Sequence, residues 1–346
     1  MLAAAGRGNR RAAMRIVMIG GTGFLGYFTC RDLAARGHDV LAAGLAPPAP
    51  GTMPDGVTSA ICDVETCTDA ELASLLEGGG AVLYAAGADG RFSGSAPVIE
   101  AYRHHNAAPI RRLVPAMRAA GSTKLVIFGS YYTALARERP ELVTLARNPY
   151  PLSRQEQMDV AFDLAGDDIG VEVLELPYIF GGAPGRGTLW GFLMDKVAAP
   201  GPVPVPGGGT ACVTAAQVAA AAAGAVDRTG PSAAWAIGGE NLSYRAIYRH
   251  FADALGITAT LVPADPERER AAAEAQRTRL AEAGMETGYD PLDVARWQEE
   301  ELFLDPAPAM DALGYGTDDI ARAIRETVLA TQAHGGQGPA CLRKPA

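Results

Sequence analysis

The first 180 residues alternate short apolar runs with segments of helical periodicity. Such alternation is typical of a parallel sheet whose two faces are both covered by helices. Strands are predicted at residues 15–19, 39–43, 58–62, 81–85, 124–128 and 171–176. Helices are predicted at residues 24–36, 69–77, 97–120 and 150–166. Because crossovers between parallel strands are right-handed, the expected fold class is α/β, a doubly wound parallel sheet of the Rossmann type.

The pattern changes after Pro177. Residues 181–209 are rich in Gly and Pro and hold one short helical stretch around Trp190 and Phe192. A loop-dominated segment of this kind favours a lid or a wall of a substrate pocket. The alanine run at 215–225 predicts a helix that returns to pack on the sheet.

The C-terminal third is expected to be mostly helical. Ser243 is a suitable N-cap for a helix that ends at Gly256, residues 266–283 predict a solvated helix, and Thr317 is the predicted cap of the last helix. The predicted division is a disordered extension at 1–13, a Rossmann domain at 14–180 with 212–238 packed on it, a smaller substrate domain at 181–211 and 239–333, and a flexible tail at 334–346.

The composition bounds the function. The chain is 48% apolar and 20% charged with a net charge of −9, and its acidic and basic residues are mixed. This balance argues against a nucleic-acid or anionic-membrane partner, and no apolar run approaches the roughly 18–20 residues that cross a bilayer. Five cysteines without a CxxC pair favour a reduced, cytoplasmic setting. The five histidines show no ligand spacing, so no metal site is predicted, and His104 and His105 are expected on a helix surface.

A glycine-rich loop joins the first predicted strand to the first predicted helix. Residues 20–26 read Gly-Gly-Thr-Gly-Phe-Leu-Gly. Gly20 permits a tight turn, Gly23 lets backbone amides approach a pyrophosphate, and Gly26 lets the helix pack closely on the strand. The sequence therefore predicts a dinucleotide site at this helix N-terminus. Its predicted residues are Gly20, Thr22, Gly23, Phe24, Leu25 and Gly26.

With its Gly-x-x-Gly-x-x-Gly spacing, the chain resembles the extended short-chain dehydrogenase/reductase family, the group of NAD-dependent epimerases, dehydratases and reductases. The resemblance extends from about residue 14 to 330. It implies that Asp63 binds the adenine end, that Asn106 breaks a helix, and that the segments after the fourth and sixth strands pass beside the cofactor. The further cofactor residues that it implies are Asp63, Val64, Ala85, Ala86, Gly87, Asn106, Tyr150, Arg154, Pro177 and Ile179.

The end of the second strand bears on the choice of cofactor. An acidic residue there would bind the adenosine ribose of NAD, whereas an arginine would favour the 2′-phosphate of NADP. Residues 42–47 are uncharged, and no Lys or Arg occurs from 39 to 90. The cofactor is expected to be NAD or NADP, and the lack of a local cation favours NAD.

The resemblance places a catalytic pair at Tyr150 and Arg154, which share a helix face at i and i+4. In the family the pair is Tyr and Lys, and the phenol exchanges a proton with the substrate oxygen. Arg keeps the positive charge and can hydrogen-bond a ribose, but it is effectively always protonated and cannot relay a proton. The substitution makes redox turnover an open question.

A serine at the end of the fifth strand is expected to orient the substrate oxygen. Ser130 is the nearest match, and a shift by one residue would put Tyr131 there and give the pocket a second phenol. Alternatively, Tyr131 and Tyr132 simply line an aromatic substrate pocket.

Three functions remain open on the sequence. The leading one is an oxidoreductase that acts on a carbonyl or alcohol of a small organic substrate. The second is an NAD-dependent epimerase or dehydratase of a nucleotide sugar, although Arg186 and Lys196 are the only cations between Arg154 and Arg228. The third is a non-redox enzyme or sensor that keeps the cofactor as a structural element. The resemblance also implies a homodimer through the helices predicted near 97–120 and 150–166.

Overall fold

A seven-stranded parallel sheet organises the N-terminal two thirds of the chain. The computed structural model describes residues 13–335. The sheet order is β11-β7-β6-β4-β1-β2-β3, which confirms the predicted doubly wound topology. Its strands are β1 (Arg15–Ile19), β2 (Asp39–Gly44), β3 (Val57–Ile61), β4 (Gly80–Tyr84), β6 (Ser122–Ser130), β7 (Gly170–Leu176) and β11 (Ala233–Ala236).

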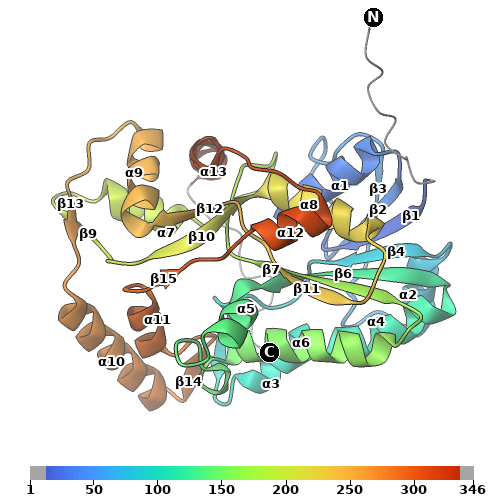
Figure 1. Cartoon of the computed structure of the whole chain (residues 1–346), viewed down its shortest axis with the longest axis horizontal. Helices are drawn as coiled ribbons and strands as arrows, with labels where there is room; N and C mark the ends of the chain where they lie inside the picture. Colours follow the sequence, from blue (N-terminus) through green and yellow to red (C-terminus); the bar gives the residue numbers. More distant parts are fainter. Residues whose placement is uncertain (1–12, 336–346) are drawn as a thin grey trace, which may run out of the picture.

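Helices cover both faces of this sheet (Figure 1). Along β1, Ile16 and Met18 point into one hydrophobic core and Val17 and Ile19 into the other, and all four are buried. Burial on both faces explains why the strand is a continuous apolar run. The helices of the first layer are α1 (Phe24–Ala35), α8 (Ala215–Asp227) and α12 (Ala307–Leu313), and those of the second are α2 (Asp69–Leu76), α4 (Ala108–Ala119) and α6 (Pro149–Ala165).

The single helix predicted at 97–120 is wrong, because the chain forms two helices there. They are α3 (Ile99–Asn106) and α4, separated at Ala107. Pro109 lies in the first turn of α4, where its missing N–H cannot continue the hydrogen bonds of α3. The break at Asn106 that the family resemblance implies is therefore present.

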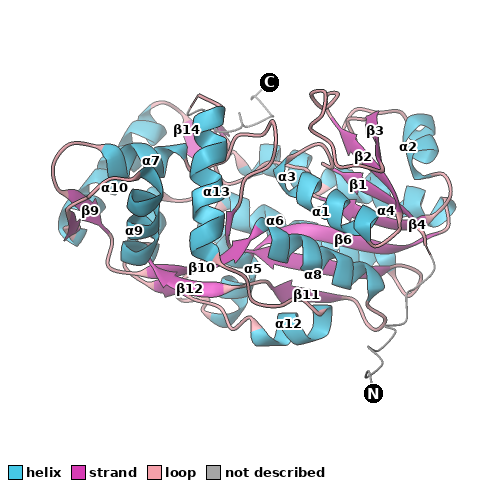
Figure 2. Cartoon of the chain, turned by 90° about the horizontal axis from the view of Figure 1, so that it is seen from above, coloured by secondary structure: helices cyan, strands magenta, loops and turns pink. Residues whose placement is uncertain are grey.

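A second group of small sheets and helices follows β7 (Figure 2). The four-stranded sheet contains β8 (Tyr178–Phe180), β10 (Gly209–Thr214), β12 (Glu240–Ser243) and β15 (Glu301–Leu302). Two pairs of strands accompany it: β9 (Val203–Val205) with β13 (Leu261–Pro263), and β5 (Ser93–Ser95) with β14 (Met285–Thr287). The other helical elements are α5 (Tyr131–Glu138), the 3-10 turn η1 (Leu145–Arg147), α7 (Gly191–Ala198), α9 (Tyr244–Leu255), α10 (Pro266–Glu282), α11 (Pro291–Trp297) and α13 (Ile320–Ala333).

The predicted helix caps are confirmed in α9 and wrong in α13. The Ser243 side chain accepts a hydrogen bond from the Ala246 amide, and Gly256 ends α9 with a left-handed φ of 70°. In α13 the N-cap is Asp319 instead of Thr317, because the helix begins at the buried Ile320 and the Asp319 carboxylate accepts from the Arg322 amide at 2.8 Å.

Several further expectations concern exposure and the chain ends. The helix α10 is almost entirely exposed, as the prediction of a solvated helix requires. No helix between residues 13 and 335 is long and apolar enough to span a membrane. Cys30, Cys62, Cys67 and Cys212 are free thiols. Cys341, the first 12 residues of the extension predicted at 1–13 and the end of the predicted tail lie outside the described residues.

Candidate active site

The glycine loop turns tightly between β1 and α1. Gly20 has a φ of +84°, which favours glycine, and its amide donates to the Ala43 carbonyl at 2.9 Å. A Cβ on Gly26 would collide with the Gly20 carbonyl oxygen and lie 2.5 Å from Gly21 Cα. A Cβ on Gly23 would meet only the Gly20 carbonyl oxygen, at 3.1 Å. Gly26 is thus required by packing, whereas Gly23 borders open space.

The first turn of α1 is free to receive an anion. Its N-cap is Gly23, no side chain caps it, and no acidic residue lies in the first turn. The first amides of a helix have no partner within the helix, and they carry a partial positive charge. This uncapped turn beside the open space at Gly23 fits the pyrophosphate of a dinucleotide.

The loop after β3 lies next to the carboxyl end of β2. The Cys62 amide donates to the Gly44 carbonyl at 2.9 Å, and Asp63 Oδ1 accepts from the Glu65 amide at 3.0 Å. The Arg112 guanidinium holds the loop by donating to the Val64 and Cys67 carbonyls. Asp63 and Val64 therefore lie at the sheet edge where the resemblance places the adenine end.

The structure brings one cation to the glycine loop that local sequence inspection missed. Arg186 follows β8, and its guanidinium donates to the carbonyls of Thr22 at 2.9 Å and of Thr52 at 2.8 Å. It also donates to the Pro184 carbonyl, and burial lowers its pKa. No residue spacing between 39 and 90 could have revealed this arginine, because it arrives from a distant loop.

Two predicted segments pass beside the glycine loop. A Cβ on Gly20 would lie 2.8 Å from the Ala85 carbonyl oxygen, and the Ala85 amide donates to the Ile19 carbonyl at 2.9 Å. Residues 85–87 therefore line the end of β1. On the other side, Ile179 packs among residues of α1 and α8. Pro177 connects β7 to β8, the strand that carries Ile179.

The helix α6 has the register that the predicted catalytic pair needs. Pro149, Tyr150 and Pro151 occupy its first turn, where amides have no partner within the helix, so Pro151 removes no helical bond. The Tyr150 amide instead donates to the Gly288 carbonyl at 2.9 Å. The Arg154 guanidinium carbon lies 5.3 Å from the Tyr150 ring centroid, and both side chains are buried.

Arg154 is held by a polar chain that sequence analysis did not predict. Its Nη1 donates to Gln157 Oε1 at 2.8 Å, and Gln157 Nε2 donates to the Asn106 carbonyl at 2.8 Å. Its Nη2 is 3.4 Å from the Ala88 carbonyl, and its Nε is buried without a partner among residues 13–335. Gln157 is fully buried and lies three residues after Arg154, so the helix period was the one signal that could have revealed it.

Asn106 connects three elements around this pair. Its Oδ1 accepts from the Ala88 amide at 2.9 Å, and its Nδ2 donates to Ser153 Oγ at 2.9 Å. The Ser153 hydroxyl in turn donates to the Tyr150 carbonyl at 2.8 Å. The buried Asn106 therefore fixes the end of α3, the loop after β4 and the helix α6 relative to one another.

Ser130 and Tyr131 have different surroundings. Ser130 ends β6, and its hydroxyl is 3.5 Å from the Tyr132 amide as the N-cap of α5. The buried Tyr131 hydroxyl lies 3.0 Å from Thr210 Oγ1. This hydrogen bond involves neither Tyr150 nor Arg154. Burial raises the pKa of Tyr131 well above the usual value, so its phenol stays neutral.

Further aromatic residues extend from Tyr132 to Tyr150. The Tyr132 ring lies 5.2 Å from Tyr289, which in turn lies 5.5 Å from Tyr150 in an edge-to-face arrangement. Trp297 lies 4.9 Å from Tyr132. Sequence analysis missed Tyr289 and Trp297, because they lie far along the chain from Tyr132 and Tyr150. Pairing of β14 with β5 anchors that segment beside residues 93–95.

The comparisons with known proteins identify the family and the fold of this chain. The sequence model of the NAD dependent epimerase/dehydratase family matches residues 16–210, more than half of the chain. The chain belongs to this family. The family is NAD-dependent, so NAD is the cofactor that membership indicates. None of the curated proteins matches the chain.

Solved structures share the fold at low sequence identity. The structure of gox2253 has a TM-score of 0.74 and 18% identity, with 94% of this chain and 99% of that chain covered. MoeE5 in complex with UDP-glucuronic acid and NAD has a TM-score of 0.65 and 17% identity, with 92% and 99% covered. The UDP-N-acetylglucosamine 4-epimerase from Bacillus cereus has a TM-score of 0.66 and 14% identity, with 92% and 97% covered.

Proposed function

We propose that this protein is an epimerase or dehydratase that acts on a nucleotide sugar and keeps NAD bound throughout its catalytic cycle. The family match carries the proposal, because residues 16–210 include the glycine loop, Asn106, Tyr150 and Arg154. Two of the structures that share the fold are a complex with UDP-glucuronic acid and NAD and an epimerase of UDP-N-acetylglucosamine. These neighbours favour the nucleotide-sugar function over the general carbonyl reduction that the sequence first favoured.

The residues around the glycine loop suit NAD. The uncapped first turn of α1, with Phe24 and Leu25, would hold the pyrophosphate. Asp63 and Val64 would bind the adenine end, and Arg154 would reach the nicotinamide ribose. When bound, NAD supplies a hydride acceptor and donor for one substrate carbon.

Tyr150 would take a proton from the substrate hydroxyl and later return it. The Arg154 guanidinium, whose carbon lies 5.3 Å from the centroid of the phenol ring, places a fixed positive charge beside Tyr150. Gln157 positions that charge by accepting from Nη1. Because Arg154 does not release its proton, Tyr150 must complete the exchange with the substrate itself, which suits a reaction that ends with the same protonation state.

A second candidate is the oxidoreductase of a small organic carbonyl or alcohol. Arg186 and Lys196, the cations considered for a substrate diphosphate, already have other partners. Arg186 donates to three backbone carbonyls, and Lys196 lies 5.3 Å from the Tyr248 ring centroid. The aromatic wall of Tyr132, Tyr289 and Trp297 would suit a small apolar substrate.

One experiment separates these functions and the non-redox alternative. The protein is incubated with NAD and either UDP-glucose or UDP-glucuronic acid, and product and nicotinamide absorbance are followed together. The proposal predicts product without net cofactor change and a transient absorbance signal in a single turnover. A stoichiometric loss or gain of reduced cofactor with a small ketone or alcohol, and no sugar product, would support the second candidate. Sugar product formed without a net cofactor change, without a transient absorbance signal and without deuterium transfer from labelled cofactor would favour non-redox chemistry. That result would overturn the proposal.

The proposal includes a cytoplasmic homodimer. A groove of about 700 Å³ along α3, α4 and α6 carries charges of both signs. These charges are Glu100, Arg103, Arg111, Glu156, Asp159 and Asp163. A two-fold axis presents the same patch from both subunits, so a surface with both signs can pair with itself.

A further inference from the structure

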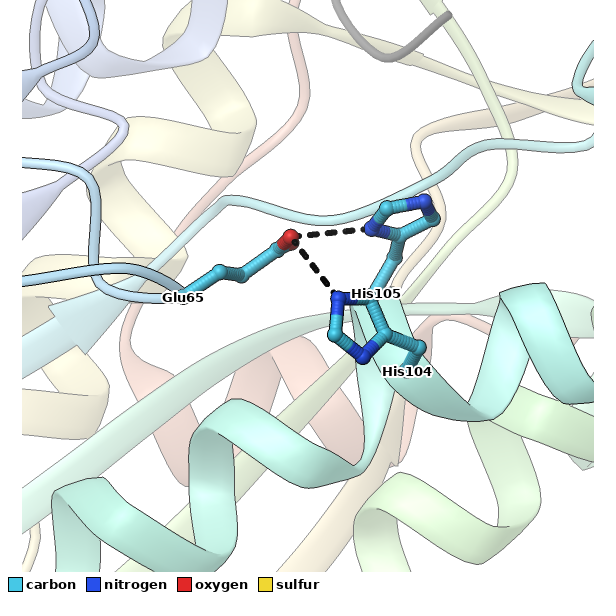
Figure 3. A group of neighbouring side chains, drawn as sticks. All are labelled: Glu65, His104 and His105. Atoms are coloured by element: carbon cyan, nitrogen blue, oxygen red, sulfur yellow. Dashed lines mark hydrogen bonds and ion pairs between the residues drawn. The ribbon is translucent and has the colours of Figure 1, made fainter. Parts of the chain in front are cut away.

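A second cluster of chemically capable side chains lies away from the Tyr150–Arg154 pair. Glu65, His104 and His105 converge between the loop after β3 and the last turn of α3 (Figure 3). Glu65 Oε2 lies 3.0 Å from His105 Nδ1 and 3.8 Å from His104 Nε2. One ligand atom from each residue lies within 4.8 Å of the other two.

These separations match those of three ligands around one metal ion. Imidazole nitrogens and carboxylate oxygens bind Zn²⁺ at about 2.0–2.2 Å in a tetrahedral arrangement, which places neighbouring ligand atoms about 3.4 Å apart. The separations of Glu65 Oε2 from the two histidine nitrogens, 3.0 and 3.8 Å, lie on either side of that value and differ from it by less than half an ångström. The ligand nitrogens of the two histidines lie within 4.8 Å of each other. Small rotations of the side chains would therefore bring all three atoms to one ion.

Burial of the three ligands suits an ion that enters from solvent. The Glu65 side chain is 4% exposed, His105 is 14% exposed and His104 is 66% exposed. The carboxylate thus forms the floor of the cluster and His104 its open side. In the single subunit, water would complete the coordination there, as in zinc sites with three protein ligands. Because His104 also lines the groove proposed for the dimer, this open side would face the partner subunit in the homodimer.

We propose that Glu65, His104 and His105 form a binding site for a divalent transition-metal ion, with Zn²⁺ as the best fit. Two imidazoles and one carboxylate are borderline ligands that favour Zn²⁺ over Mg²⁺ or Ca²⁺, which prefer oxygen ligands alone. No spacing pattern could predict this site, because Glu65 and His105 are 40 residues apart. The site is independent of the proposed reaction.

Two neighbouring features compete with or oppose such an ion. Cys62 and Cys67 lie in the same loop as Glu65, but burial raises the pKa of Cys62 to about 12, which disfavours the thiolate that a metal requires. The Arg112 guanidinium is 3.3 Å from the Glu65 carbonyl oxygen and contributes positive charge on the backbone side of the loop. The Glu65 carboxylate, whose Oε2 lies 3.0 Å from His105 Nδ1, supplies the compensating charge.

Although the site takes no part in the proposed reaction, it lies next to the loop after β3 that contains Asp63. The Glu65 amide donates to Asp63 Oδ1 at 3.0 Å, and His105 directly precedes Asn106. An ion that joins Glu65 to α3 would therefore hold the loop at 63–65 against the helix end that Asn106 ties to α6.

The test is equilibrium dialysis of the full chain against Zn²⁺ alone, after treatment with a chelator and without cofactor. We expect one ion per chain, and visible d–d bands of nitrogen and oxygen coordination when Co²⁺ replaces Zn²⁺. His104→Ala and Glu65→Gln should each weaken binding by more than the roughly 10–100-fold that loss of a supporting hydrogen bond costs at a metal site. His334→Ala is the matched control, since this exposed histidine ends α13 far along the sequence from the cluster.

Three results would overturn the proposal. They are no stoichiometric binding, undiminished binding in His104→Ala, and loss of binding in a Cys62→Ser/Cys67→Ser variant with sulfur-to-metal charge-transfer bands in the wild type. Because His104 is largely exposed, its replacement leaves the fold intact, and unchanged circular dichroism verifies this.

Discussion

Replacing Gln157 by Leu tests whether Arg154 is positioned by the buried polar chain. In the wild type, Gln157 accepts from the guanidinium at 2.8 Å and donates to the Asn106 carbonyl at 2.8 Å. Leu has a similar volume and neither hydrogen-bonding group. The substitution therefore leaves one charged donor and one carbonyl without these partners in a fully buried position.

The cost follows from these two bonds. A hydrogen bond to a charged group contributes about 1.5–3 kcal/mol, and a buried carbonyl left unpaired costs about 1–3 kcal/mol. Gln157→Leu should thus lower the free energy of unfolding by about 2.5–6 kcal/mol. Arg154→Met leaves only Gln157 Oε1 unpaired at this contact and should cost about 1–3 kcal/mol. In the double variant the shared bond is lost once, so the two effects should fall short of additivity by about 1.5–3 kcal/mol.

The assay is urea unfolding of the wild type, both single variants and the double variant, all without cofactor. Gln155→Leu is the control on the same helix, because Gln155 bonds only the exposed Asp159, and its cost should stay within about 0.5 kcal/mol. Additivity of the Arg154 and Gln157 effects within about 0.5 kcal/mol would refute the claim that the two side chains act together.

The site and the proposed dimer give four further predictions. Tyr150→Phe should abolish turnover and leave NAD affinity nearly unchanged, because only the proton-transferring hydroxyl is lost; steady-state kinetics and calorimetry will check this. Arg154→Lys should retain activity. Complete inactivity of Arg154→Lys would contradict the role assigned to Arg154. Gly26→Ala should cost about 1–3 kcal/mol in urea unfolding because its Cβ meets the backbone of Gly20 and Gly21, and a cost no larger than that of Gly316→Ala, where space is open, would argue against the packing role. Sedimentation should show a dimer of the 35.9 kDa chain at micromolar concentration, and a monomer alone would exclude the proposed homodimer.

The sheet could be predicted because its signal is local. Every residue of β1 after Arg15 is apolar and buried, so the strand shows directly in the sequence. The break between α3 and α4 was obscured because Ala107 and Ala108 suit a helix, and only Asn106 and Pro109 indicate the interruption. Cap choice at α13 was equally ambiguous, since 317–319 offers three suitable side chains in a row.

The sequence could predict the parts of the site that lie within a single helix or a single loop. The spacing of Tyr150 and Arg154 survived in α6 because prolines in a first helical turn do not disturb it. Tyr289 and Arg186 could not be predicted, because each reaches its position through tertiary packing of a segment more than 100 residues away. The same reason hid the approach of Glu65 to His105.

The most direct test of the central claim is calorimetric titration of NAD into wild type, Gly23→Val and Gly316→Val, each first freed of any co-purified dinucleotide. A side chain at Gly23 has one backbone contact at 3.1 Å and otherwise enters the space assigned to the pyrophosphate, so the variant should fold. We expect NAD to bind the wild type and Gly316→Val, and to bind Gly23→Val roughly tenfold or more weakly, a loss of at least about 1.4 kcal/mol. Equal NAD affinity in all three proteins would show that the glycine loop does not hold the pyrophosphate.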